Sequence, residues 1–301
     1  MKTPLSTLRG SALLIVLWAL LLLSAATFAW AVWVQQRIAV AGEENRAVEA
    51  RAMARTGMTL AMHPQVSRLT PLPPEEIVPG AGYEVRIRGE GGKLNINWFM
   101  RGEEPMKLAL FKNWLTRRGL DLKQIQTFMD CLLDYIDADN VKRLNGAEDE
   151  GDYHPANREL LSVEELAKVR GTGPLTSQPG WQDELTVYSM GPIDLASADA
   201  EVLGLLPGIG EARMQQFLKM RAGPDGIDGT VDDTIFPSLA AIQQVLGLSA
   251  AQFQVLQPLV TYQDPTMNLQ SIGHSGDTKR TIKVVVRKGG PQPQILSWLE
   301  E

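Results

Sequence analysis

The sequence predicts an α+β protein in which a long N-terminal helix packs on a small antiparallel sheet, with all-α subdomains inserted between the strands. Three observations support this fold class. An uncharged apolar run extends from Ser11 to Val34, and no proline follows it until Pro64. Alternating strand patterns occur near residue 90 and again near residue 290. The long stretch between them has mainly helical periodicity.

The apolar run has the composition of a membrane anchor. It is long enough to cross the hydrocarbon core of a bilayer, about 30 Å thick, as a helix. Lys2 and Arg9 precede it, and Glu43 and Glu44 follow it. The positive-inside rule then places the N-terminus in the cytoplasm and the rest of the chain outside it. We therefore expect a single-pass membrane protein, whose partner is the lipid bilayer and whose C-terminal domain lies outside the cytoplasm.

A cleaved secretory signal peptide is the alternative reading of this segment. Such a peptide would be cut near Ala26 or Ala31. The apolar run is longer than the usual signal core of about 7–15 residues, which favours the anchor. Beyond it, Ile38, Val48 and Leu60 are spaced among charged residues as in an amphipathic helix. One continuous helix is predicted to end at His63, because the residue before a proline disfavours helix.

The strand patterns lie at the two ends of the remaining chain. Residues 83–87 and 93–97 alternate on either side of a glycine-containing turn at 89–92, which predicts a β-hairpin. Residues 185–188 form a short strand candidate. Residues 281–287 and 294–298 alternate again, and a turn at 275–277 precedes them. A proline-rich linker is expected at 72–80.

A helical hairpin motif occurs at Leu206-Pro207-Gly208-Ile209-Gly210, and residues 236–248 have the composition of a partner unit. The motif resembles a helix-hairpin-helix element, and such elements can bind DNA through backbone N–H groups and lysines. Glu211 follows directly and would repel phosphate. The net charge of −6 also argues against wholesale phosphate neutralisation. We expect no nucleic acid partner and assign the motif to protein packing; a membrane-anchored DNA-binding protein of a competence system is the alternative.

Two acidic segments are candidate calcium sites, because Ca²⁺ prefers six to eight hard oxygen ligands. The first is a flexible glycine-rich loop at residues 223–233 with the carboxylates Asp225, Asp228, Asp232 and Asp233. The second could use Asp137, Asp139 and Glu148. The spacing of the first is not that of an EF-hand. A solvated acidic turn, or helix-capping carboxylates in the second segment, is the alternative.

Other chemistry has little support in the sequence. Cys131 is the one cysteine and lies in an apolar run, so we expect a buried inert thiol. His63, His154 and His274 lack the spacing of zinc ligands. No nucleophile elbow, P-loop or dinucleotide fingerprint is present. We therefore expect a non-enzymatic protein.

The segment Arg9-Gly10-Ser11, directly before the apolar run, resembles a type IV prepilin leader. The resemblance implies that a prepilin peptidase cuts between Gly10 and Ser11. Most pilins carry glutamate at the fifth position after the cut, where this chain has Ile15. The K-type minor pseudopilin of type II secretion characteristically lacks that glutamate, which suits a subunit with no other above it.

The order of several phrases along the chain is similar to that K-type family. They are Leu94-Asn95-Ile96-Asn97, the segment 132–139, Asn145-Gly146-Ala147-Glu148, the segment 185–189 and Ile295-Leu296-Ser297-Trp298. The family implies a tip complex with the I-type and J-type minor pseudopilins, which initiates and caps the pseudopilus for export across the outer membrane. It also implies an anchor in the bacterial inner membrane and a C-terminal domain in the periplasm. It also implies glycine-rich calcium loops like residues 223–233.

These expectations divide the chain into five parts. They are a leader at 1–10, a long helix at 11–63 with its transmembrane part at 11–34, strands of a pseudopilin α/β domain at 80–100, 181–191 and 265–301, a helical subdomain at 101–180, and a helix-hairpin-helix-like subdomain at 192–264.

Overall fold

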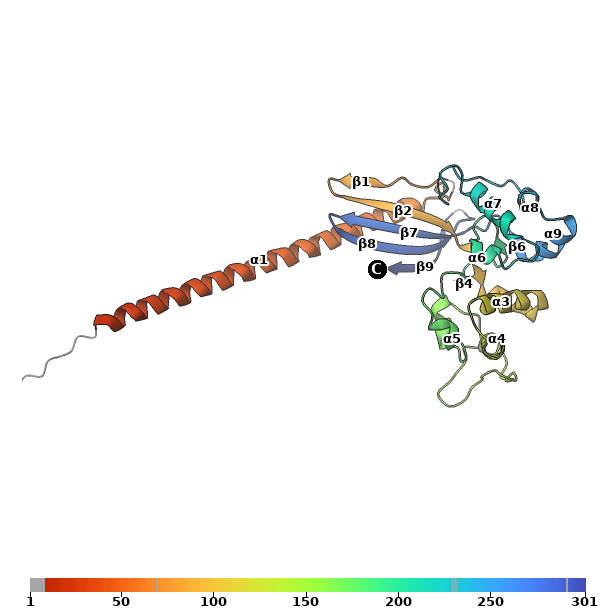
Figure 1. Ribbon diagram of the computed structural model, residues 1–301, viewed down its shortest axis with the longest axis horizontal. Helices are drawn as coiled ribbons and strands as arrows, with labels where there is room; N and C mark the ends of the chain where they lie inside the picture. Colours follow the sequence, from red (N-terminus) through yellow and green to blue (C-terminus); the bar gives the residue numbers. More distant parts are fainter. Residues whose placement is uncertain (1–8, 69, 229, 231, 291) are drawn as a thin grey trace, which may run out of the picture.

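The computed structural model describes residues 9–301 except residues 69, 229, 231 and 291, with side chains from Leu13 onward. Figure 1 shows a long helix, α1 (Arg9–Ala61), that extends far beyond a head of strands and short helices. The mixed α+β fold expected from the sequence is confirmed. The expected leader lies largely outside the described residues, since residues 1–8 are not among them.

Helix α1 has two halves with different surroundings. Its apolar first half, from Leu13 to Trp33, is exposed along nearly its whole length. Its second half buries Ala50, Ala54, Met58 and Ala61, which recur every three or four residues and so lie on one face. That face packs on the sheet, and the helix ends at Ala61, two residues before the expected His63.

The sheet against α1 has five antiparallel strands in the order β1-β2-β7-β8-β9. Their bounds are Glu75–Val78, Ala81–Gly89, Thr266–Ser275, Thr278–Arg287 and Gln294–Glu300. Alternate residues point to the helix and form a small core with Met58. They are Tyr83, Val85, Ile87, Leu269, Ile282, Val284 and Val286. The expected C-terminal strands and the turn at 275–277 are therefore present.

Glycine lets α1 approach strand β7 closely. A Cβ atom at Gly273 would lie 2.0 Å from the carbonyl oxygen of Ala50 and 2.3 Å from the nitrogen of Ala54. On the helix side, a Cβ atom added at Gly57 would lie 2.5 Å from Ser271 Oγ. Backbone therefore packs directly on backbone here, which fixes the position of the helix on the sheet.

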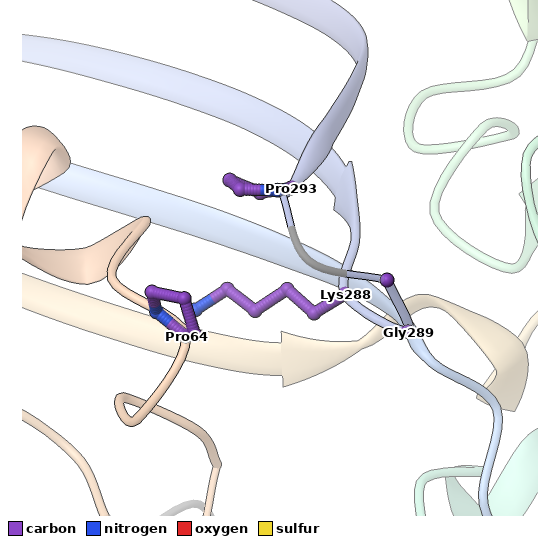
Figure 2. Close-up of a pocket in the computed structure, with 5 residues that line it drawn as sticks. Pro64, Lys288, Gly289 and Pro293 are labelled. Atoms are coloured by element: carbon purple, nitrogen blue, oxygen red, sulfur yellow. The ribbon is translucent and has the colours of Figure 1, made fainter.

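The C-terminal end of α1 is held by Lys288, the residue after β8 (Figure 2). Its ammonium donates hydrogen bonds to the carbonyl oxygens of Ala61, His63 and Val66. Pro64 and Pro293 line a shallow cavity of about 170 Å³ beside it. The end of the anchor helix and the β8–β9 connection are thereby joined.

The prediction of a β-hairpin at residues 83–97 is wrong. Strand β2 pairs with β1 and β7, and β1 occupies part of the expected linker. A 3-10 turn at Glu90–Gly92 leads into β3 (Leu94–Asn95), which pairs in parallel with β4 (Leu185–Thr186). The chain then enters α2 (Ile96–Met100) because the Asn95 side chain accepts the Trp98 N–H and caps the helix. The alternation of Leu94 and Ile96 fits a hairpin strand and also fits the observed short strand followed by a helix.

The placement of residues 181–191 in the pseudopilin sheet needs correction. Strand β4 lies in the separate two-stranded β3–β4 sheet, not in the five-stranded one. It joins the helical subdomain, whose core contains the rings of Phe99, Phe111, Trp114 and Phe128. The remaining elements of this subdomain are a 3-10 turn at Arg101–Glu103, α3 (Pro105–Arg117), α4 (Leu122–Ile136), a 3-10 segment at Val163–Lys168 and α5 (Gly173–Thr176).

Residues 192–264 form two short helical hairpins beside the sheet. A parallel pair of β5 (Ile193–Asp194) and β6 (Val260–Thr261) joins the two ends of this segment. Its helices are α6 (Ala200–Leu203), α7 (Glu211–Arg221), α8 (Leu239–Leu246) and α9 (Ala250–Leu256), with a 3-10 turn at Gln257–Leu259. Gly208, with φ of 86°, and Gly247, with φ of 66°, make the two tight turns.

Candidate functional site

One helix of the described chain is long and apolar enough to span a membrane. It covers Leu13–Ala61, and its most apolar window has a mean hydropathy of 2.3 and is not buried at all by the rest of the protein. In a soluble core helix such residues would be covered by other elements. The exposed half of α1 is therefore suited to lipid or to neighbouring apolar helices. Gly10 and Ser11, the predicted processing residues, lie within its first turns.

The residues Asp137, Asp139 and Glu148 come together at the end of α4, and we call them the acidic cluster. One carboxylate oxygen from each lies within 4.8 Å of the others. Asp137 caps the C-terminal end of α4, and Glu148 returns toward it from the following loop. The three carboxylates are close enough together to share an ion, as the sequence predicts, and calcium binding here stays a prediction.

Several oxygens of the acidic cluster have no hydrogen-bond partner. Both carboxylate oxygens of buried Glu148 and the Oδ1 atom of Asp137 are unpaired within the described residues. Asp139 Oδ1 accepts the N–H of Val141. Burial raises the pKa of Glu148, and the negative charges of Asp134, Asp137 and Asp139 raise it further. A buried, unpaired carboxylate is costly, and a hard cation would remove that cost.

Arg143 forms ion pairs with one member of the acidic cluster and with two neighbouring carboxylates. Its Nη1 atom donates to Asp134 Oδ1 over 2.7 Å and to Asp137 Oδ2 over 2.6 Å, and its Nη2 atom donates to Glu103 over 2.8 Å. The guanidinium thus contacts Oδ2 of Asp137, while Oδ1 has no hydrogen-bond partner among the described residues. The donor set is all oxygen, which fits Ca²⁺ and not the thiolate and imidazole preference of zinc.

The loop at residues 223–233 has a different arrangement. Asp228 forms an ion pair with buried Arg221, at 3.0 Å. Asp232 accepts hydrogen bonds from the Asp225 N–H and the Thr230 hydroxyl, and Asp225 accepts the Ile227 N–H. Asp233 accepts the Thr230 N–H. Among the described carboxylates, those of this loop do not converge as the acidic cluster does. Calcium binding here stays a prediction.

The turn between α6 and α7, residues 204–210, carries no charged side chain and leads directly into Glu211. Glu211 is the first residue of α7, where a negative charge is favoured by the helix dipole. Gly210 caps the helix without a side-chain bond. Leu206 is buried and Ile209 packs against the main core. The apolar residues of the hairpin therefore pack inside the head, and the absence of a nucleic acid partner stays a prediction.

Comparison with known proteins identifies a family over the helical subdomain. The family described as type II secretion system (T2SS), protein K, matches residues 92–178, which include the acidic cluster. Type II secretion system protein K of Dickeya chrysanthemi is 28% identical over 145 residues, or 40% of this chain and 41% of the relative. The protein of that name from Pseudomonas aeruginosa is 26% identical over 177 residues, or 54% of this chain and 51% of the relative.

These matches show that the chain is similar to type II secretion system protein K, and within residues 92–178 it matches that family. The sequence matches span about half the length of the curated relatives or less. The fold comparison extends further. A chain in the crystal structure of the GspK-GspI-GspJ complex from enterotoxigenic Escherichia coli matches with a TM-score of 0.59. At 14% identity, this match covers 89% of this chain and 99% of that chain, and it shows a shared fold.

The sequence alone does not indicate the roles of Arg143 and Lys288. Nothing local indicates that Arg143 contacts three carboxylates, two at the end of α4 and a third, Glu103, in the 3-10 turn before α3. Lys288 lies in a turn composition typical of exposed residues. Its contact with the end of α1 joins residues that are 227 positions apart. Only the tertiary fold brings these groups together.

Proposed function

We propose that this chain is a minor pseudopilin that works with I-type and J-type minor pseudopilins at the tip of the type II secretion pseudopilus. The observation that supports it most is the division of α1 into an exposed apolar half and a half packed on a five-stranded antiparallel sheet. A helix of this kind can leave the bilayer and continue into a filament core without refolding the head. The helical subdomains make the head bulky, as a capping subunit requires.

The proposed orientation follows from charge. Lys2 and Arg9 precede the apolar segment, which favours a cytoplasmic N-terminus and a periplasmic head. A prepilin peptidase would then act at Gly10–Ser11 on the cytoplasmic side. Ile15 leaves the mature helix without a glutamate near its N-terminus, which suits a subunit at the top of the assembly. The work of the chain is assembly rather than catalysis.

The acidic cluster is the proposed calcium site. Its three carboxylates lie close together, and some of their oxygens have no hydrogen-bond partner among the described residues. Backbone carbonyls or water would complete the six to eight ligands that Ca²⁺ prefers. Bound calcium would hold the loop 139–148 against the end of α4. The ion has a structural role in this proposal, because it neutralises charge within the head.

The test is co-expression of the full chain with the I-type and J-type subunits and an active or inactive prepilin peptidase. We expect an affinity-purified complex of all three subunits in detergent. The mass of the N-terminal peptide should show a start at Ser11 that requires the active peptidase. A start at Met1, or after Ala26 or Ala31, with no complex, would contradict the proposal.

A further inference from the structure

The two edges of the five-stranded sheet differ in how they are protected. Strand β1 is short, carries Glu75 and Glu76, and is followed by Pro79, all of which discourage pairing with another strand. Strand β9 has seven residues, and its central residues are uncharged. Ile295, Trp298 and Leu299 are 50%, 42% and 50% exposed. Within the described chain, β9 pairs with β8 alone. An unprotected apolar edge is a template for a further strand.

The register shows which backbone groups of β9 are free. Thr281 and Glu301 exchange both backbone hydrogen bonds. Bonded and non-bonded pairs alternate along an antiparallel ladder, so the pairs Ile282–Glu300 and Val284–Trp298 are non-bonded. The N–H and C=O groups of Trp298 and Glu300 therefore point away from β8, toward the open edge. Their natural partner is the extended backbone of another strand.

An exposed ridge of α1 leads to this edge. Trp33, Val40 and Val48 are 52%, 53% and 70% exposed, and their spacing places them on one helix face. The same face carries Arg51 and Arg55, which lie 3.5 Å and 3.1 Å from Glu300 of β9. A second helix packed along this ridge would therefore bring its own head beside β9.

The direction of β9 argues against a second copy of this chain. The first residues of β8 lie near Glu49 of α1, which accepts a hydrogen bond from Ser275 at the end of β7, and β8 ends near Ala61, which Lys288 contacts. Strand β9 therefore runs back toward the membrane end of α1, as Figure 1 shows. Every strand pair in this sheet is antiparallel, and two β9 strands that continued this pattern would point the two anchors in opposite directions. Both anchors could not then enter one bilayer.

We propose that the open edge of β9 and the adjoining ridge of α1 dock a pilin-like subunit of a different kind, which adds one of its own edge strands to the sheet. This inference rests on the proposed function, since the partner must carry its own membrane helix. The main-chain groups at Trp298 and Glu300 supply the strand pairing, and the α1 ridge supplies apolar contact. The sheet would become continuous across two subunits.

The test compares Trp298→Pro with Trp298→Val in the full chain, co-expressed with the I-type and J-type subunits. Both changes remove the indole, but only proline removes the N–H that faces the open edge. The valine variant should co-purify with the partners as the parent does. The proline variant should bind about tenfold more weakly, because it loses one backbone hydrogen bond and its ring obstructs the edge. Equal co-purification of the two variants would overturn the inference and leave the proposed function intact.

A second measurement covers the case in which the proline variant fails to fold. The full chain with p-benzoylphenylalanine in place of Leu299 would be illuminated in cells that express all three subunits. A crosslink to the I-type or J-type subunit is expected. A crosslink to a second copy, or none while the three-subunit complex still forms, would overturn the inference. Absence of the complex in the parent would instead count against the proposed function.

Discussion

The Lys288 ammonium donates a hydrogen bond over 2.6 Å to the carbonyl oxygen of Ala61, the last residue of α1. It also reaches the carbonyl oxygens of His63 and Val66, at 3.1 Å and 2.7 Å. The last carbonyls of a helix lack partners within the helix, and the negative end of its dipole attracts a cation. A single side chain from the β8–β9 connection therefore closes the end of the anchor helix.

Replacement of Lys288 by methionine should destabilise the head. The change keeps the apolar stem but leaves three carbonyl oxygens without their charged donor. We expect the free energy of unfolding to fall by about 2 kcal/mol, the usual size for hydrogen bonds to a charged group. Denaturant unfolding of the full chain in detergent measures it. Lys279→Met, at an exposed position, is the matched control. Equal stability of the two variants would contradict a capping role.

Replacement of Glu148 by glutamine should weaken calcium binding. The change keeps the shape of the side chain but removes one charged ligand from the acidic cluster. We expect the calcium dissociation constant to rise at least about tenfold, as measured by calorimetry or by terbium luminescence. Without calcium the variant should be at least as stable as the parent, because the unpaired buried charge is gone.

Asp225→Asn is the control for the calcium experiment, since it changes a carboxylate in the other acidic loop. It should leave the affinity of the acidic cluster unchanged. Loss of binding in this variant, with normal binding in Glu148→Gln, would place the ion in the loop 223–233 instead. The two variants thereby separate the two sequence predictions of a calcium site.

Replacement of Gly273 by valine should displace α1 from the sheet. A Cβ atom there would lie 2.0 Å from the Ala50 oxygen, so the helix would have to move away from the strand and lose its packing on the sheet. We expect a loss of about 3 kcal/mol of stability. Limited proteolysis in the second half of α1 would report the release of the helix. Gly289→Ala is the control, since its nearest neighbour would be 3.6 Å away.

The sequence contains enough information for the outer plan of this fold. The apolar run, the absence of proline before Pro64 and the alternation at 281–287 predict α1 and the C-terminal strands, because each signal is local and periodic. The segment 93–97 led to a wrong prediction because its signal is also local and periodic. Its alternating residues suit a strand, but the Asn95 cap and the burial of Phe99 and Met100 select a helix after two residues.

The candidate site was only partly predictable. Asp137 and Glu148 could be proposed as ligands from residue type, but the sequence favoured the loop 223–233, where acidic residues are more densely spaced. The fold instead engages that loop in its own hydrogen bonds and in the Arg221–Asp228 ion pair. Burial decides which carboxylates remain unpaired, and burial depends on contacts between distant segments.

The buried carboxylate of Glu165 should make the head sensitive to acid. Burial by itself raises the pKa of this group. Hydrogen bonds from the Arg158 guanidinium, the Leu161 N–H and the Tyr135 hydroxyl lower it more, so the net pKa lies below its ordinary value of 4.5. The folded state therefore favours the charged form. The stabilisation is fully present above the unfolded pKa and is lost as the pH falls through the folded pKa.

Glu165→Gln provides the test of this pH dependence. At pH 7 the variant should be less stable than the parent by about 2 kcal/mol, because hydrogen bonds to the charged carboxylate are replaced by weaker ones. As the pH falls below 4.5, the parent should lose this advantage and the two unfolding curves should converge. Glu164→Gln, at the neighbouring exposed position, should follow the parent throughout. A constant gap between parent and Glu165→Gln from pH 7 to pH 3 would mean that packing, not charge, accounts for the contribution of Glu165.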